Sequence, residues 1–202
     1  MRIHSIVSKT ASEGPGLRFC LWVQGCSRHC KGCFNPETWD PAGGEEWTAE
    51  ALLSAIDAAP GIEGVTLLGR EPFEQPGELA ALCAAVRARG LSVAAFTGYT
   101  LEELRARRDP ATDALLGQID LLMDGPFILE QQDFSRPWIG SRNQRYHFLT
   151  DRYSLNDIKN ARQRVEFRIG PDGSIAINGM PDLPMQTILG MLNAGGSHGK
   201  QE

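Results

Sequence analysis

LRFCLWVQGCSRHCKGCFNPETW, residues 17–39, joins a short apolar run to three closely spaced cysteines. The run Leu17–Gln24 is flanked by glycines and is too short for a helix, so it predicts a buried strand. Cys26, Cys30 and Cys33 follow at once with the spacing C-x3-C-x2-C. A loop with this spacing can wrap one inorganic centre, and soft thiolates select zinc or an iron–sulfur cluster.

A structural zinc site or a closed four-iron cluster would need a fourth ligand. His29, Cys20 and Cys83 are the candidates. Cys20 lies within the predicted strand and Cys83 within an apolar helical stripe, positions that favour packing in the core over ligation. If none of the three serves, a four-iron cluster keeps one iron open, which suits catalysis better than electron storage.

The rest of the chain alternates between short apolar runs and helical patterns. Further strands are predicted at 65–68, 91–96, 119–123 and 146–149. Helices are predicted near 48–59, around the stripe 79–86, after the capping box at Thr100 and after Asp109-Pro110. Strand–helix–strand repetition predicts parallel strands with crossover helices. A complete eight-stranded barrel needs about 250 residues, so a full one would be cramped in this chain, and we expect an α/β fold.

The pattern changes toward the C-terminus. Val165–Ile169 and Ile175–Ile177 alternate apolar and polar residues on either side of a Pro-Asp-Gly turn, which predicts a β-hairpin. We therefore expect the main α/β domain over 1–164, the hairpin with a short helix packed on it over 165–193, and a disordered tail over 194–202.

Six ordered segments accompany the cysteine triplet: EGPGLR at 13–18, VQGC at 23–26, CFNPETW at 33–39, FTGYT at 96–100, DLLMDGPF at 120–127 and GSRNQ at 140–144. With them the chain resembles the radical S-adenosylmethionine enzymes, and within these the family of activases that serve anaerobic ribonucleotide reductase. The resemblance weakens beyond about residue 165, where the hairpin begins.

The resemblance implies that the α/β fold is a partial, incomplete TIM-type barrel of parallel strands with crossover helices. It also implies that the three cysteines hold a [4Fe–4S] cluster whose open iron is chelated by S-adenosylmethionine. Reductive cleavage would give a 5′-deoxyadenosyl radical, which generates a glycyl radical on a partner enzyme, expected to be anaerobic ribonucleotide reductase. A flavodoxin- or ferredoxin-type protein is the expected electron donor. The implied cofactor-binding residues are Phe34, Asn35, Gly69, Arg70, Glu71, Tyr99 and Asp124. Contacts to the partner or substrate are expected from Ser141, Asn143 and Gln144.

One segment departs from the family pattern. The family has Gly-Gly-Glu or Gly-Gly-Asp after its second strand, and this chain reads Leu68-Gly69-Arg70-Glu71. A backbone that approaches a ligand closely favours glycine. Arg70 is therefore open to three interpretations: it binds the substrate carboxylate, it points outward and is tolerated, or it impairs binding.

The composition argues against a nucleic-acid-binding protein and against a membrane protein. With 20 Lys+Arg against 25 Asp+Glu and a formal charge of −5, general nucleic-acid binding is disfavoured. No apolar run reaches the roughly 20 residues of a membrane span, and the N-terminus lacks a signal-peptide pattern, so we expect a cytoplasmic protein with no membrane partner. Two other functions stay open: a radical enzyme acting on a peptide or small molecule, and a non-catalytic cluster or electron-transfer protein.

Overall fold

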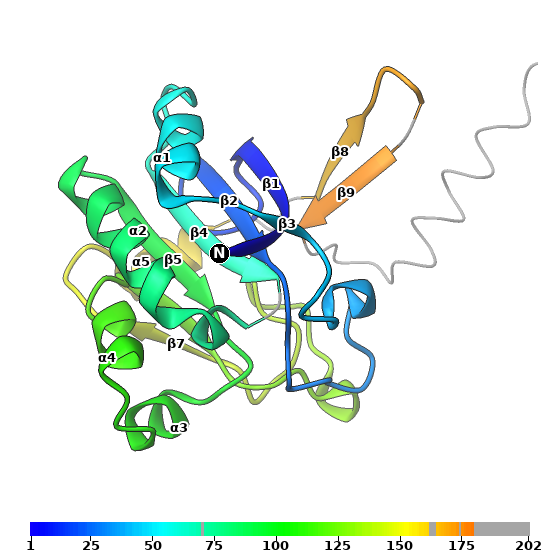
Figure 1. Ribbon diagram of the computed structural model, residues 1–202. Helices are drawn as coiled ribbons and strands as arrows, with labels where there is room; N and C mark the ends of the chain where they lie inside the picture. Colours follow the sequence, from blue (N-terminus) through cyan, green and yellow to red (C-terminus); the bar gives the residue numbers. More distant parts are fainter. Residues whose placement is uncertain (70, 162–164, 174, 180–202) are drawn as a thin grey trace, which may run out of the picture.

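A seven-stranded mixed sheet forms the centre of the protein (Figure 1). The computed structural model describes residues 1–69, 71–161, 165–173 and 175–179. The strands are β1 (Arg2–Thr10), β2 (Arg18–Val23), β3 (Glu45–Glu46), β4 (Gly64–Gly69), β5 (Ser92–Phe96), β6 (Leu121–Asp124) and β7 (Arg145–Phe148). Their order across the sheet is β3-β1-β2-β4-β5-β6-β7. The neighbours β2, β4, β5 and β6 run parallel, whereas β1, β3 and β7 pair antiparallel with their neighbours.

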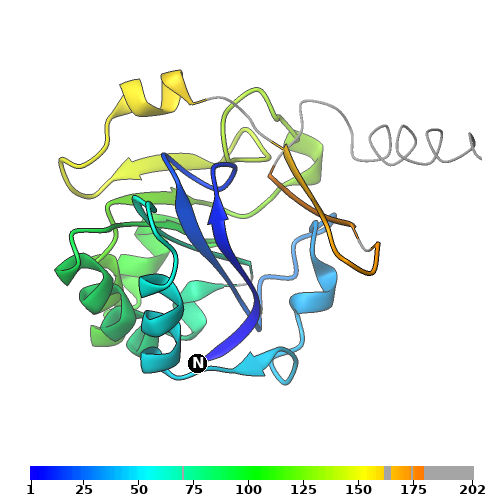
Figure 2. The same ribbon diagram turned by 90° about the horizontal axis from the view of Figure 1, so that it is seen from above.

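Helices cover the sheet unequally. They are α1 (Ala49–Asp57), α2 (Pro76–Ala88), α3 (Leu101–Ala106), α4 (Pro110–Leu116) and α5 (Leu155–Asn160), with 3-10 turns at η1 (Pro36–Thr38), η2 (Pro72–Glu74) and η3 (Leu129–Gln131). Figure 2 shows α1, α2 and α4 gathered on one side of the sheet, away from α5. No helix in the described part of the chain is both long and apolar enough to cross a bilayer.

The core lies on both faces of the parallel strands. On the helix-covered face, Val93 and Ala95 of β5 pack in a cluster with Leu79 and Leu82 of α2. The intervening Ala94 points to the opposite face and packs with residues that include Met123, Trp138 and Ile158. This alternation explains why these strands read as continuous apolar runs in the sequence.

The predicted α/β class is confirmed, and so is the hairpin, with strands β8 (Val165–Ile169) and β9 (Ile175–Gly179). The capping box at Thr100 and the cap at Asp109 are also present. The predicted parallel strands with crossover helices are confirmed for β2, β4, β5 and β6. The sheet also carries β1, β3 and β7 antiparallel, and its order leaves β3 and β7 as edges. That the fold is a partial TIM-type barrel stays a prediction. The expected helix within 180–193, the tail 194–202 and Arg70 lie outside the described residues.

A buried arginine ties together the amino ends of the strands. Arg18 is 0% exposed, and burial lowers its pKa. Its Nε donates to Thr66 Oγ1 at 3.0 Å and its Nη1 to Tyr153 Oη at 3.0 Å. Further hydrogen bonds run to Ser92 Oγ and the Val65 carbonyl, so neutral oxygens surround the guanidinium. Arg18 thus joins β2, β4 and β5 at the end of the sheet opposite the cysteine loop.

Candidate metal and cofactor site

The candidate site lies where the parallel strands end. β2 leads into the cysteine loop, β4 into Gly69–Glu71, β5 into Thr97–Tyr99 and β6 into Asp124-Gly125. Parallel strands place all their carboxyl ends at one edge of a sheet, where α/β folds carry their sites. The segments singled out in the sequence, remote from one another along the chain, therefore gather at this edge.

The cysteine loop is closed at its base by its own backbone. Gly25 N donates to Thr38 O at 3.1 Å, and Cys26 N donates to Trp39 O at 3.3 Å. One residue earlier, the Gln24 side chain donates to the Asp40 carbonyl at 2.7 Å. Because these bonds pair 24–26 with 38–40, the ligand-bearing part forms a self-contained lobe on the end of β2.

The three thiols are partly exposed and free of disulfides. A backbone bond of 3.1 Å from Cys33 N to Cys30 O folds the last two into one turn. Burial raises the pKa of Cys26, and hydrogen bonds from the backbone N–H groups of Arg28 and His29 act in the opposite direction. Donors aimed at a sulfur stabilise its thiolate form, which is the form that binds a metal.

This donor set fits a cluster with three protein ligands. Among the residues that the structure describes, no three His, Cys, Asp or Glu side chains converge closely enough to hold a single metal ion. A four-iron cluster binds each thiolate through a different iron and tolerates wider separation. The proposed fourth ligands are engaged elsewhere: the His29 ring stacks on Trp39 with centroids 4.7 Å apart, and Cys20 and Cys83 are fully buried.

The last residue of β4 approaches the end of β2, the strand that leads into the cysteine loop, at backbone distance. Gly69 has φ +95°, and a Cβ added there would lie 2.9 Å from both Trp22 Cα and Val23 N. Only glycine fits this position.

Glu71, two residues on, is 1% exposed and connects three elements of the site. Its carboxyl accepts hydrogen bonds from Phe73 N at 3.1 Å, Thr97 Oγ1 at 2.8 Å and Gly98 N at 2.8 Å. Its own N–H donates to Gly25 O at 3.3 Å. Burial raises its pKa to about 7, although the three donors lower it. Glu71 therefore acts as a brace between the ends of β4 and β5 and the base of the cysteine loop.

Replacement of Glu71 by Ala is expected to lower the free energy of unfolding by about 3–5 kcal/mol, because it leaves buried donors without acceptors. Glu71→Gln keeps one acceptor oxygen and should cost less. Since the folded pKa is raised, stability from Glu71 is complete below the ordinary value of 4.5 and is lost as pH rises through about 7. Urea unfolding across pH should show the wild type losing stability relative to Glu71→Gln; parallel pH curves would contradict this.

Tyr99, at the end of β5, contacts the cysteine loop directly. Its hydroxyl lies 3.1 Å from Ser27 Oγ. The guanidinium carbons of Arg28 and Arg107 lie 4.6 and 4.0 Å from the centre of its ring. Tyr99 is thus sandwiched between two cations, one of them inside the cysteine loop.

Phe34 and Asn35 follow the last cysteine. Phe34 is 49% exposed, and its ring lies 5.3 Å from Phe127. The Asn35 carbonyl accepts from Thr38 N and Thr38 Oγ1 at 3.3 and 3.1 Å, whereas its side chain does not cap η1. An exposed aromatic ring and an amide side chain beside the thiols are suited to contact a purine.

Asp124 is fully buried and bound to protein groups. One of its oxygens lies 2.7 Å from Leu101 N, 2.6 Å from Arg145 Nη2 and 2.8 Å from His147 Nε2. The pKa of Asp124 is lowered, because these hydrogen bonds and charges outweigh its burial. The residue joins β6, β7 and α3, and its role toward a cofactor stays a prediction.

The polar residues Ser141, Asn143 and Gln144 hold the loop that follows β6. Gln144 Oε1 accepts from Gly140 N at 2.8 Å and Ser141 N at 3.1 Å, and its Nε2 donates to Gly125 O at 3.1 Å. Asn143 Nδ2 donates to the Pro126 carbonyl at 2.7 Å. These three residues fix the exit of β6, and contacts to a partner stay a prediction.

Three supporting residues were missed in the sequence. Glu74 Oε1 accepts from Ser27 N at 3.0 Å, Gln75 Nε2 donates to Gln24 O at 3.0 Å, and Arg107 stacks on Tyr99. Glu74 and Gln75 act across about 50 residues of chain, and no local pattern marks such residues. They hold the start of the cysteine loop against η2, whereas Arg107 supports Tyr99.

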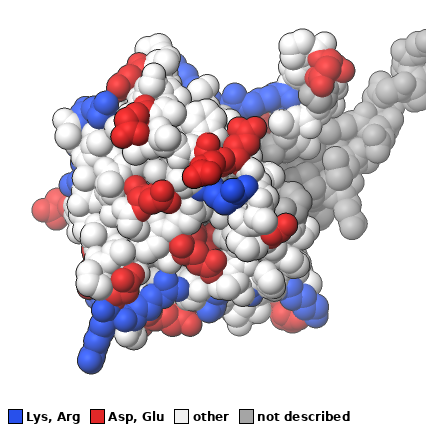
Figure 3. All heavy atoms as spheres, viewed as in Figure 1, with Lys and Arg blue, Asp and Glu red and all other residues white. Residues whose placement is uncertain are grey.

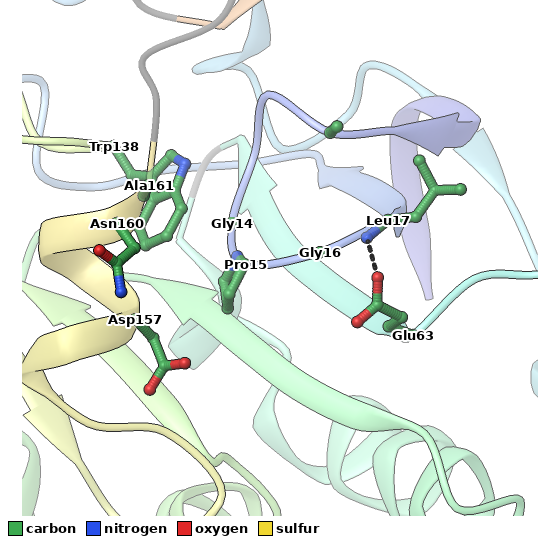
Figure 4. Close-up of a pocket in the computed structure, with 10 residues that line it drawn as sticks. Gly14, Pro15, Gly16, Leu17, Glu63, Trp138, Asp157, Asn160 and Ala161 are labelled. Carbon is green, nitrogen blue, oxygen red and sulfur yellow. Dashed lines mark hydrogen bonds between the residues drawn. The ribbon is translucent and has the colours of Figure 1, made fainter.

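A cavity of about 460 Å³ lies at the opposite edge of the sheet (Figure 4). Gly14, Pro15 and Gly16 line it on one side, and Asp157 of α5 lies on the other. Glu63, also in the lining, accepts from Leu17 N at 3.0 Å. The cavity is therefore separated from the thiols by the length of the parallel strands.

Charges are mixed on the surface seen in Figure 3. Acidic and basic side chains are interspersed over that face without one large patch of a single sign. Nothing on this face resembles the basic stripe that tracks a nucleic-acid backbone.

The sequence is similar to a known protein family and to several activating proteins of known name. A family profile described as "4Fe-4S single cluster domain" matches residues 12–147. The anaerobic ribonucleoside-triphosphate reductase-activating protein of Vibrio cholerae is 36% identical over 159 residues, covering 74% of this chain and 99% of that protein. Its Escherichia coli K12 counterpart is 31% identical over 157 residues, with the same coverage. The pyruvate formate-lyase-activating enzyme of Clostridium pasteurianum is 41% identical over 106 residues, covering 48% of this chain and 44% of that enzyme.

Proposed function

Because the chain belongs to the radical S-adenosylmethionine family of anaerobic ribonucleoside-triphosphate reductase-activating proteins, we propose that it generates a glycyl radical on a partner enzyme. The cofactors of this family are a [4Fe–4S] cluster and S-adenosylmethionine. One observation carries the proposal: the three-thiol loop is held at the carboxyl edge, beside Gly69, Glu71 and Tyr99.

The chemistry that these groups supply when bound is one-electron cleavage of the sulfonium C–S bond, with methionine and a 5′-deoxyadenosyl radical as products. Cys26, Cys30 and Cys33 bind the cluster. The backbone at Gly69 would hold the amino group of S-adenosylmethionine, and Glu71 would keep the end of β4 in place for it. Phe34 and Asn35 are assigned to the adenine side of the site.

The partner that we propose is an anaerobic ribonucleotide reductase, as the relatives' names indicate for those proteins. When bound, the cofactors would supply the removal of a hydrogen atom from a glycine of the partner, with a glycyl radical and 5′-deoxyadenosine as the products. The electron comes from a flavodoxin- or ferredoxin-type donor, for which the partly exposed loop offers an entry point. The sheet leaves β7 as an edge strand, and an open edge suits a large protein substrate.

Anaerobic reconstitution with iron and sulfide, followed by reduction and addition of S-adenosylmethionine, tests the proposal. We expect 5′-deoxyadenosine to form and, with the reductase present, a glycyl-radical signal in electron paramagnetic resonance. Formation of 5′-deoxyadenosine with a peptide or small molecule but no glycyl radical on the reductase would assign another substrate. Iron binding without any cleavage would mean a cluster carrier, and zinc in place of iron would overturn the cluster.

Arg70→Gly is expected to leave the affinity for S-adenosylmethionine within about threefold of the wild type. Gly69 has a positive φ and a close approach to the backbone of β2, so this position of the motif already holds the glycine that its conformation requires. Equilibrium dialysis with the reconstituted protein measures this affinity, with Arg70→Lys as the charge-preserving control. Tenfold tighter binding by the glycine variant would show that Arg70 obstructs the site, and tenfold weaker binding would assign it a ligand contact.

A further inference from the structure

His29, inside the cysteine loop, has a backbone conformation that side chains rarely adopt. Its φ is +44°, in the left-handed region, where a residue with a Cβ is strained. Among the residues that the structure describes, the only others besides glycine with a positive φ are Arg108 and Trp138, and both lie outside the loop. Strain of this kind persists only where the surroundings impose it, and such residues cluster at functional sites.

The left-handed turn directs two successive backbone N–H groups at one sulfur. The N–H groups of Arg28 and His29 both donate hydrogen bonds to the Cys26 thiol. Successive N–H groups beside a left-handed residue form a concave donor site, an arrangement that occurs at phosphate and iron–sulfur sites. Because Cys26 binds iron as a thiolate, the two donors face a negative charge that grows when the cluster is reduced.

Trp39 connects the two ends of this turn. Its backbone carbonyl accepts from Cys26 N at 3.3 Å, and its indole ring stacks on the His29 ring with centroids 4.7 Å apart and 28° between the planes. Trp39 N in turn donates to Pro36 O at 3.2 Å, at the end of η1. His29 is an exposed residue, so burial in the core does not hold its backbone. The stack on the indole therefore offsets the strain.

The residues before His29 are anchored to the body instead. Ser27 N donates to Glu74 Oε1 at 3.0 Å, and the Arg28 guanidinium carbon lies 4.6 Å from the centre of the Tyr99 ring. These contacts fix the start of the turn. The left-handed residue, by contrast, packs on a ring that belongs to the loop itself, so the loop carries its own means of shaping the turn.

We propose that Trp39 is a positioning residue for the cluster: its stack on His29 holds the left-handed turn that aims two N–H groups at Cys26, and so sets how readily the bound cluster accepts an electron. Hydrogen bonds to cysteine sulfur stabilise the reduced cluster, which carries more negative charge, and so raise its reduction potential. The inference rests on the part of the proposed function that places a [4Fe–4S] cluster on the three cysteines. It does not depend on S-adenosylmethionine cleavage or on the partner.

An anaerobic redox titration of the reconstituted full chain, followed by visible absorbance and electron paramagnetic resonance, tests the proposal. Trp39→Leu removes the ring contact, and we expect its reduction equilibrium to fall about tenfold, which corresponds to about 59 mV for a one-electron couple. Trp39→Phe keeps an aromatic face and should stay within about threefold of the wild type. Trp47→Leu is the matched control, because Trp47 packs against the core and lies outside the loop, and its potential should be unchanged.

A glycine at position 29 separates the shape of the turn from other effects of the indole. Glycine adopts a positive φ without strain, so the double variant Trp39→Leu/His29→Gly should regain the wild-type reduction equilibrium within about threefold. His29→Val keeps Trp39 but places a β-branched residue at the strained position, so it should lower the potential as Trp39→Leu does. Hydrogen exchange of residues 27–30 should be faster in these two low-potential variants than in the wild type and the double variant.

Contrary results are distinct. Equal potentials in the wild type and Trp39→Leu would overturn the proposal. A lowered potential that His29→Gly does not restore would also overturn it, because Trp39 would then act by excluding water from the cluster. If Trp39→Leu binds no iron, His29→Val decides, and an unchanged potential in that variant counts against the proposal. The expected shifts without any 5′-deoxyadenosine would contradict the proposed function and support this inference, whereas a wild type that binds no iron would overturn both.

Discussion

Cys30→Ser is expected to abolish stable cluster binding and to reduce 5′-deoxyadenosine formation to background. A serine hydroxyl is a much poorer ligand for iron than a thiolate, and the other two thiols cannot replace it. Neither buried cysteine lies within reach as a substitute, because both are fully enclosed in the core. Iron and sulfide per chain, the visible absorbance and single-turnover 5′-deoxyadenosine measure the loss.

Cys83→Ala and Cys20→Ala are the matched controls. Both remove a thiol, but burial raises the pKa of each, to about 12 for Cys83, so neither readily offers a thiolate. They should retain the full iron content and lose only packing energy, on the order of 1 kcal/mol. Loss of iron in Cys20→Ala, with iron retained in Cys30→Ser, would show that the ligand set has been assigned wrongly.

The cysteine loop could be predicted because its determinants are local. Three thiols within eight residues, after a buried strand, limit the centre to zinc or an iron–sulfur cluster and fix the edge on which it lies. The parallel strands were also predictable, since β4 and β5 are buried on both faces and read as short apolar runs. Caps at Thr100 and Asp109 depend only on residues three positions away.

What escaped prediction depends on partners far away in the chain. β1 was missed because its buried and exposed positions follow no clean alternation, and its place is set by pairing with β2. Asp124 was expected at a cofactor, yet Arg145 and His147 of β7 reach it only after the strands pair. Glu71 belongs to a recognisable motif. Its hydrogen bonds to Thr97 and Gly98 could not be predicted, because they form only when β4 and β5 lie side by side.

Gly69→Ala is expected to lower the free energy of unfolding by about 3–5 kcal/mol and to abolish S-adenosylmethionine cleavage. Two costs add at this position. A residue with a Cβ is strained at φ +95°, and the Cβ would lie 2.9 Å from backbone atoms of Trp22 and Val23, which cannot rotate away. The neighbouring strand would have to move, and β2 is the strand that carries the cysteine loop. Urea unfolding and product formation measure the two effects.

Gly90→Ala separates the two costs. Gly90 has φ +77°, close to that of Gly69, but an added Cβ would meet nothing within 4 Å. The control should therefore show only the conformational penalty, about 1–2 kcal/mol, with cleavage of S-adenosylmethionine unchanged. Equal losses in the two variants would mean that the backbone angle alone is costly and that contact with β2 adds nothing. A larger loss at Gly69, together with a lower iron content, would show that the segment after β4 also positions the cysteine loop through direct backbone contact.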